Sequence, residues 1–233
     1  MPELADNLHF SEKVENLKPS GIRIFDNKVS EIPNIIKLTL GEPDLNTPEH
    51  VKKAAVKSIE ENDSHYAPQK GKKELLEAIS RFLDKTIHVK YDPKSEIVAT
   101  VGATEAINVA IFALFNPEDK ILVPTPVFSL YWPVANLAGV QYSLVNTASD
   151  DFKLTAEKLE EVVKNDSTIK GVILNYPTNP TGVEYSHEEI KQLAKIVEKY
   201  NLYVITDEIY SSLTYGVEHY SIATEIPERT LYI

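Results

Sequence analysis

The sequence has no cysteine among its 233 residues, and methionine and tryptophan occur once each. Without cysteine there is no disulfide framework, thiol nucleophile or thiolate metal ligand. Basic residues are also scarce, because 24 Lys and Arg stand against 35 Asp and Glu, a formal net charge of −11. Such an excess of acid leaves no positive field to attract nucleic acid or an anionic membrane. We therefore expect neither kind of partner.

Long hydrophobic runs are missing too, and none reaches the roughly 18 apolar residues of a membrane span. The first six residues are polar and acidic and lack the basic and apolar regions of a secretory signal. The six histidines are scattered, with no pair at the helical spacing typical of metal ligands. We expect a cytoplasmic protein without a metal site.

What the sequence does contain is 42% hydrophobic residues, enough for one substantial core. From residue 97 onward, short β-rich runs alternate with helical segments. This alternation predicts an α/β fold with a mostly parallel sheet covered by helices on both faces. The predicted strands are 97–101, 121–123, 142–145, 171–174, 202–206 and 231–233, and the predicted helices between them are 104–115, 130–137, 155–165 and 186–200.

The N-terminal region is less regular. Residues 1 to about 45 are polar, are interrupted at Pro19 and Pro33, and lack a long periodic segment, which predicts an extended arm. We divide the chain into an N-terminal arm at 1–47 and one domain at 48–233.

Two amphipathic helices are predicted between the arm and the sheet. Thr47 and Pro48 are typical of an N-cap and a first helical position. A second helix follows Gly71, with an apolar stripe spaced for burial. The stripe consists of Leu75, Leu76, Ile79, Phe82 and Leu83.

A glycine turn joins the predicted strand 97–101 to the helix after it. Gly102, Ala103 and Thr104 stand where a strand enters a buried helix, and free backbone N–H groups and the helix dipole would favour a phosphate there. The ordinary alternative is a strand-to-helix turn with Thr104 as its N-cap.

Two further loops follow predicted strands. Phe128 comes after residues 121–123, at a strand end where an aromatic ring can stack on a planar ligand, although a plug over the core is a common alternative. The sequence Asn179-Pro180-Thr181-Gly182 forms a rigid turn that can hold the Asn179 amide toward a ligand oxygen.

Asp207 ends the predicted strand 202–206. A buried carboxylate is costly unless it is paired, and a protonated pyridine nitrogen would keep it ionised. Tyr210, three residues later, is placed to reach a hydroxyl of such a ring. The alternative is that Asp207 only caps the next turn.

These motifs, with Gly41-Glu42-Pro43-Asp44 and Tyr66-Ala67-Pro68, stand in the order and approximate spacing of a known family. From about Pro19 onward the chain resembles the class I, fold-type I aminotransferases of the aspartate and aromatic kind, which depend on pyridoxal phosphate. The resemblance implies a three-layer α/β/α large domain in 48–233, with 1–47 belonging to a small domain. It also implies ping-pong transfer of an amino group between an L-amino acid and a 2-oxo acid.

The resemblance implies roles for eight residues. Asp207 would pair with the pyridine nitrogen, Asn179 and Tyr210 would bind the ring oxygen, and Ala103 and Thr104 would hold the phosphate. Three more roles follow from the same motifs. Phe128 would stack on the ring, Tyr66 would reach the phosphate of the neighbouring subunit in a homodimer, and Gly41 would line the substrate carboxylate pocket.

One feature of the family has no match. Its Schiff-base lysine should lie roughly five residues beyond Ile233, so we assign no catalytic residue and expect a truncated, inactive large domain. The lysines near the motifs belong to polar helix faces and loops. They are Lys70, Lys72, Lys73, Lys191, Lys195 and Lys199.

Two alternatives stay open. One is a β-eliminating carbon–sulfur lyase of the same fold, and the other is a non-catalytic binding or assembly module that retains the fold. Within the transaminase interpretation, aspartate, aromatic and acylated diamino-acid donors are all compatible with the sequence.

Overall fold

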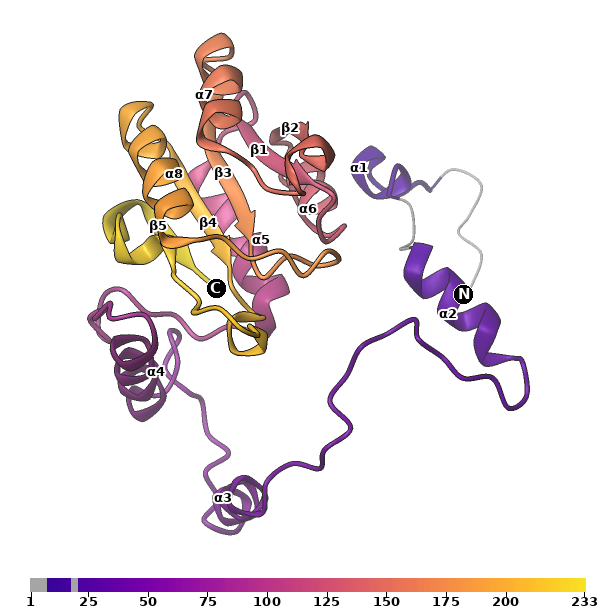
Figure 1. The fold of residues 1–233 in the computed structure, drawn as a ribbon. Coiled ribbons are helices and arrows are strands. Elements are labelled where there is room, and N and C mark those ends of the chain that lie inside the picture. Colours follow the sequence, from indigo (N-terminus) through magenta and orange to yellow (C-terminus); the bar gives the residue numbers. More distant parts are fainter. Residues whose placement is uncertain (1–7, 18–20) are drawn as a thin grey trace.

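A five-stranded parallel sheet forms the centre of the computed structural model, which describes residues 8–17 and 21–233. The strand order is β2-β1-β3-β4-β5, and each neighbouring pair is parallel (Figure 1). The predicted parallel α/β sheet is therefore confirmed. The strands are β1 (Lys120–Thr125), β2 (Gln141–Asn146), β3 (Ile169–Asn175), β4 (Tyr203–Asp207) and β5 (Thr230–Tyr232).

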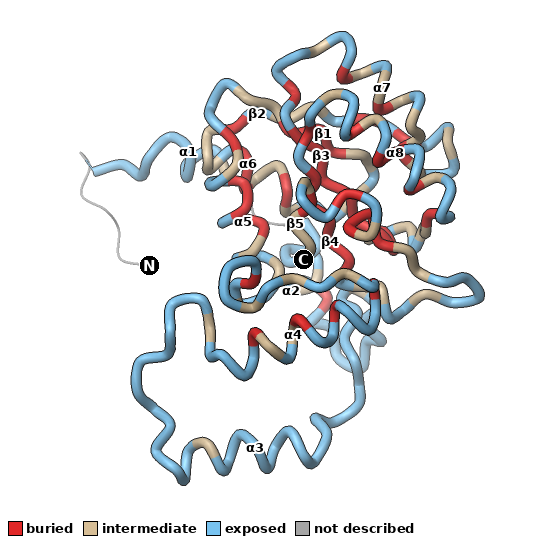
Figure 2. The backbone as a smooth tube through the Cα atoms, turned by 90° about the vertical axis from the view of Figure 1, so that its left-hand side faces the viewer, coloured by how far each residue is buried: buried red, intermediate tan, exposed pale blue. Residues whose placement is uncertain are grey.

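Helices cover both faces of this sheet. Side chains that alternate along β3 enter different cores: Val172 and Leu174 pack with α7 (Ala156–Asn165) and α8 (His187–Lys199), whereas Ile173 faces the opposite way. The second core is formed with α5 (Gly102–Leu114) and α6 (Tyr131–Ala138). Figure 2 shows the buried residues concentrated in the strands and in the helix faces turned toward them. The fold is the predicted three-layer α/β/α arrangement.

The covering helices begin where the sequence supplies caps. Thr155 accepts a hydrogen bond from the Lys158 backbone at the start of α7. Ser186 and Glu189 form a reciprocal capping box at the start of α8, which satisfies two N–H groups that the helix itself cannot. Both helix starts lie within one residue of their predicted positions.

The N-terminal region differs from the predicted extended arm. It contains α1 (Glu12–Glu15) and the ten-residue helix α2 (Gly21–Ser30), while Pro19 lies outside the described residues. Only Val29 of α2 is buried. Thr39 and Lys37 both bind the Asp26 carboxylate and tie the following chain to the helix. Of the apolar residues of α2, Ile22, Ile24 and Phe25 are exposed.

The next two helices are α3 (Glu49–Glu60) and α4 (Lys73–Thr86). Pro48 is the N-cap of α3 and not its first helical residue, so the predicted start was wrong by one position. No residue of α3 is buried, and the helix lies apart from the sheet (Figures 1 and 2). In α4, Leu76 and Leu83 are buried as expected, whereas Leu75 and Phe82 are exposed. The division at residue 47 stays a prediction.

The predicted strand at 97–101 was also wrong. Residues 97–100 have no regular secondary structure, because no strand among the described residues pairs with them. Short 3₁₀ turns complete the chain. They are η1 (Ala148–Asp150), η2 (Ser211–Leu213), η3 (Ile222–Thr224) and η4 (Pro227–Arg229).

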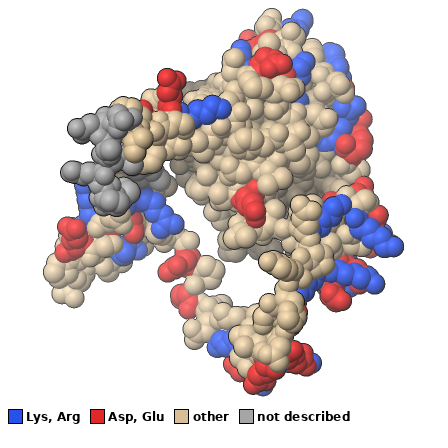
Figure 3. All heavy atoms as spheres, turned by 180° about the vertical axis from the view of Figure 1, so that it is seen from behind, with Lys and Arg blue, Asp and Glu red and all other residues tan. Residues whose placement is uncertain are grey.

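No helix among residues 8–17 and 21–233 has the length and apolar character to cross a membrane. On the face drawn in Figure 3, basic and acidic side chains are interspersed and no continuous basic patch is visible. This distribution agrees with the acidic balance of the sequence.

Gly171 in β3 gives a test of the packing. A Cβ atom added there would stand 2.6 and 2.8 Å from two ring atoms of Phe115, which is itself buried. We expect Gly171→Ala to lower the free energy of unfolding in urea by about 1–3 kcal/mol, the usual cost of overpacking a core. Gly41→Ala, where no atom lies within 4 Å, is the control and should be close to neutral. Equal effects of the two changes would contradict this packing.

Candidate functional site

A small cavity of about 80 Å³ opens where the carboxyl ends of β3 and β4 meet the start of α5 and the loop after β1. This is the edge at which open parallel sheets bind ligands. Six of the eight residues named from the sequence line it, although they are spread over more than 100 positions of the chain. The lining residues are Ala103, Thr104, Ile107, Phe128, Leu130, Asn175, Asn179, Asp207, Ile209 and Tyr210.

Asp207 is the buried charge of this cavity, with only 4% of its surface exposed. Its Oδ2 accepts a hydrogen bond of 2.7 Å from the Tyr131 hydroxyl, and its Oδ1 accepts a longer one of 3.4 Å from the Ile209 backbone. Burial raises the pKa of the Asp207 carboxyl, and the Tyr131 hydrogen bond opposes that rise. No basic side chain among the described residues forms an ion pair with it, so Asp207 has the chemistry to receive a cation from a ligand.

Amide groups connect Asp207 to the neighbouring loop. Asn175 Nδ2 donates to the Asp207 carbonyl at 2.9 Å, and Asn175 Oδ1 accepts from the Asn179 backbone N–H at 2.9 Å. The Asn179 side-chain amide in turn lies 3.4 Å from the Tyr210 hydroxyl. These bonds fix the positions of two polar groups, Asn179 and Tyr210, on one side of the cavity.

The other walls are an aromatic ring and a helix start. Phe128 is 37% exposed and packs edge-to-face on Tyr131, with the ring centroids 6.3 Å apart. Ala103 and Thr104 lie in the first turn of α5, where backbone N–H groups have no partner within the helix. Gly102 has a φ of +75°, a conformation that favours glycine where the irregular segment 97–101 enters α5.

The remaining two residues named from the sequence lie elsewhere. Tyr66 is fully exposed, and Gly41 is exposed with no atom within 4 Å of an added Cβ. Neither lines the cavity. Their roles, and the ligand roles of the other six, stay predictions.

Sequence reasoning missed two residues that organise the site. Tyr131 lies three positions after Phe128, and Asn175 opens the loop that contains Asn179. Each lies within four residues of one that the sequence singled out, but neither carried a signal of its own. A buried tyrosine and a strand-end asparagine are common core residues, and only the tertiary contact with Asp207 distinguishes them.

A second, part-buried cluster is formed around Glu208, the residue next to Asp207 in the sequence. His219 Nε2 is 2.7 Å from Glu208 Oε2, and its Nδ1 is 3.1 Å from Glu184 Oε2. Glu208 Oε1 also accepts hydrogen bonds from Thr206 and Ser221, at 2.7 and 2.8 Å. The cluster joins the chain after β3 to the chain after β4, and so holds together the two segments that carry Asn179 and Asp207.

Tyr131→Phe tests the hydrogen bond to Asp207. The change leaves a buried carboxylate oxygen without its main donor, so we expect a loss of about 1–3 kcal/mol in the free energy of unfolding at neutral pH. Because burial raises the pKa of Asp207, the loss should be smaller at acidic pH, where the carboxyl is protonated. Urea unfolding at neutral and at acidic pH measures this loss. Tyr215→Phe, at a tyrosine that is 84% exposed, should have no effect at either pH.

The ion pairs of His219 predict that the free energy of unfolding falls at alkaline pH. Burial by itself would lower the pKa of His219, but the hydrogen bonds that the imidazole donates to the carboxylates of Glu184 and Glu208 outweigh it and raise the pKa from 6.5 to about 9. Since the folded pKa lies above the unfolded one, the stabilisation is complete below pH 6.5 and is lost as pH rises through 9. We expect the difference in unfolding free energy between wild type and His219→Gln to shrink by about 3 kcal/mol over this range.

The control for His219 is His50→Gln, at an exposed histidine. Its difference from wild type should stay constant with pH. A constant difference for His219→Gln as well would contradict the charged state assigned to the cluster.

Comparisons with known proteins match most of the chain. The family model for aminotransferase class I and II matches residues 33–231. A probable N-acetyl-LL-diaminopimelate aminotransferase of Bacillus subtilis is 42% identical over 221 residues, which are 95% of this chain and 56% of that protein. A probable aspartate aminotransferase of Methanocaldococcus jannaschii is 37% identical and covers 91% of this chain and 55% of its own length.

Solved structures show the same relationship. The aspartate aminotransferase from Thermus thermophilus with maleate superposes with a TM-score of 0.91 at 31% identity, covering 97% of this chain and 59% of that one. The chain thus spans somewhat more than half the length of these relatives. Sequence, fold and the arrangement of strand-end residues agree, and the chain belongs to the class I and II aminotransferase family.

Proposed function

We propose that these residues form the ring-binding part of a pyridoxal-phosphate site, in a protein that transfers an amino group between an L-amino acid and a 2-oxo acid. The observation that carries the proposal is the Asp207 carboxylate, which is buried at the cavity and has no cationic partner among the described residues. A protonated pyridine nitrogen would supply that cation.

The side chains present suit this cofactor. An acid for the ring nitrogen, an amide and a phenol for a ring oxygen, an aromatic ring for stacking and a helix start for a phosphate all border one cavity. At about 80 Å³ the cavity is smaller than the roughly 300 Å³ or more of complete small-molecule sites. We therefore assign to these residues the walls that hold the ring and phosphate, and not the whole site.

When bound, the cofactor supplies an electron sink for the substrate carbon. Asp207 holds the proton on the ring nitrogen, and Tyr131 keeps the carboxylate oriented through its hydroxyl. Asn179 and Tyr210 orient the ring oxygen, and Phe128 excludes water from one face of the ring. Ala103 and Thr104 bind the phosphate through their backbone N–H groups.

The same residues do not supply a base for proton transfer at the substrate carbon. No lysine lines the cavity formed by the described residues. We infer that the 233 residues by themselves bind the cofactor without transferring amino groups. The relatives are named for aspartate and diaminopimelate derivatives, so we propose an L-α-amino acid donor and no narrower class. The full exposure of Tyr66 is compatible with its proposed role across a homodimer.

Calorimetric titration with pyridoxine 5′-phosphate tests the binding role. This ligand has no aldehyde, so it cannot react with surface lysines and reports only noncovalent binding. We expect Asp207→Asn to weaken binding about 10- to 100-fold, which corresponds to the 1.5–3 kcal/mol of a charged hydrogen bond.

The matched control is Asp84→Asn, at an exposed aspartate of α4. It should bind as the unaltered chain does. If the unaltered chain shows no saturable binding, or if both variants bind equally well, the proposed cofactor site is wrong.

A further inference from the structure

His219 connects two segments of the chain without lining the cavity at Asp207. Its Nδ1 is 3.1 Å from Glu184 Oε2, and its Nε2 is 2.7 Å from Glu208 Oε2. The His219 and Glu184 side chains are each 10% exposed, and that of Glu208 is 0% exposed. The proposed cofactor chemistry makes no use of this enclosed histidine.

Both nitrogens of the His219 ring face carboxylate oxygens. An ionised carboxylate accepts hydrogen bonds and donates none, so both contacts are satisfied only when both ring nitrogens carry a proton. When the ring loses one proton, one carboxylate loses its donor, and two negative charges face each other across a neutral ring. Glu208 would then keep the hydrogen bonds from Thr206 and Ser221 alone.

Glu208 connects His219 to one polar group of the cavity. The Ser211 backbone N–H donates to the Glu208 carbonyl at 2.9 Å, which closes a turn that contains Tyr210. Tyr210 follows Glu208 by two residues and lines the cavity. A movement of Glu208 therefore moves Tyr210 as well.

Glu184 connects His219 to the other polar group. Val183, the residue before Glu184, accepts a hydrogen bond of 3.0 Å from the Thr178 backbone N–H. Thr178 is the residue before Asn179, which lines the cavity. The position of Asn179 therefore depends on the segment that Glu184 fixes.

The two connections meet at the Asn179 amide and the Tyr210 hydroxyl, which are 3.4 Å apart. This distance is long for a hydrogen bond, so the contact between the two groups does little to hold them in place. Their relative position is set by the segments that carry them.

We propose that His219 is a positioning residue whose charged form aligns Asn179 and Tyr210 with the cofactor ring. Loss of its proton separates the segments of Glu184 and Glu208 and weakens cofactor binding. This inference rests on the proposed function and adds control of the same site by pH.

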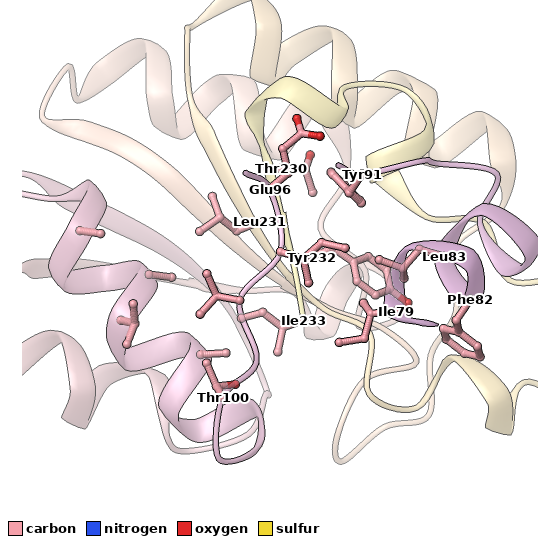
Figure 4. Close-up of a pocket in the computed structure, with 16 residues that line it drawn as sticks. Ile79, Phe82, Leu83, Tyr91, Glu96, Thr100, Thr230, Leu231, Tyr232 and Ile233 are labelled. Atoms are coloured by element: carbon pink, nitrogen blue, oxygen red, sulfur yellow. The ribbon is translucent and has the colours of Figure 1, made fainter. Parts of the chain in front are cut away.

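Three tyrosines stand close to the cluster. The Tyr176 ring lies 5.4 Å from the His219 ring, whereas Tyr91 and Tyr232 are near Glu208 and line an apolar groove of about 490 Å³ between β5, α4 and α5 (Figure 4). Burial raises the pKa values of Tyr91 and Tyr232 to about 12, and that of Tyr176 well above its ordinary value. The three tyrosines thus keep their protons while His219 loses its own.

Nuclear magnetic resonance of the histidine ring protons tests the proposal in the unaltered chain. His219 is assigned from the signal missing in His219→Gln, and its titration is followed with and without saturating pyridoxine 5′-phosphate. Coupling between two binding events is reciprocal, so a ligand that prefers the charged form must lower the acid dissociation constant of His219. We expect a decrease of about fivefold or more, whereas exposed His50 should titrate equally in both samples.

Tyr210→Phe separates this path from the charge of the ligand. The variant keeps the ring and loses the hydroxyl, so the ligand should change the acid dissociation constant of His219 by less than about twofold. Tyr215→Phe, at a tyrosine that is 84% exposed, is the matched control and should retain the full decrease.

Calorimetric titration measures the same coupling as an affinity. The dissociation constant of His219→Gln is divided by that of the unaltered chain at the same pH, which removes the effect of the ligand's own protonation. We expect this ratio to be about fivefold or more at pH 7 and close to one at pH 10, where His219 is neutral too. His50→Gln should give a ratio close to one at both.

Three results would overturn the proposal. The first is an acid dissociation constant of His219 that the ligand leaves unchanged, and the second is a His219→Gln ratio that is equal at pH 7 and pH 10. The third is a ligand effect on His219 that persists in full in Tyr210→Phe. Each of them leaves the cofactor site standing, because the same titrations show saturable binding. Absence of saturable binding would instead refute the proposed function, and this inference with it.

Discussion

A carboxylate at the end of a buried strand must find donors or a cation, because leaving it unpaired costs several kcal/mol. Asp207 receives a hydroxyl hydrogen bond from Tyr131, and Asn175 holds its backbone carbonyl. These contacts join β4 to α6 and to the loop after β3. The polar side of the cavity is arranged around the Asp207 carboxylate. A cationic group of a ligand would pair with the charge of this carboxylate.

The parallel sheet is what makes this arrangement possible. Parallel strands end at the same edge, so loops distant in the sequence converge there. The Glu184–His219–Glu208 cluster connects two of those loops, with His219 between two carboxylates. The outer side of the cavity is formed by exposed residues such as Phe128.

The two sides of the sheet differ in how completely they are covered. Helices α5 to α8 bury both faces, and β2 ends the sheet with polar side chains. At β5 the edge is apolar and faces a groove. The same helix, α5, therefore contributes its first turn to the candidate cofactor site and a later turn to the groove, which places the two features on one structural element.

The sequence by itself determined the α/β alternation, the helices that begin near residues 155 and 186, and the motifs that converge at the cavity, because helix starts and strand-end loops are local signals. It did not reveal α2, whose apolar residues are mostly exposed, and it assigned residues 97–101 to a strand because composition cannot supply a partner. Only the tertiary structure decided that Tyr131, Asn175 and His219 support the site. Their roles arise from contacts between segments 30 or more positions apart in most cases, and such contacts leave no local pattern.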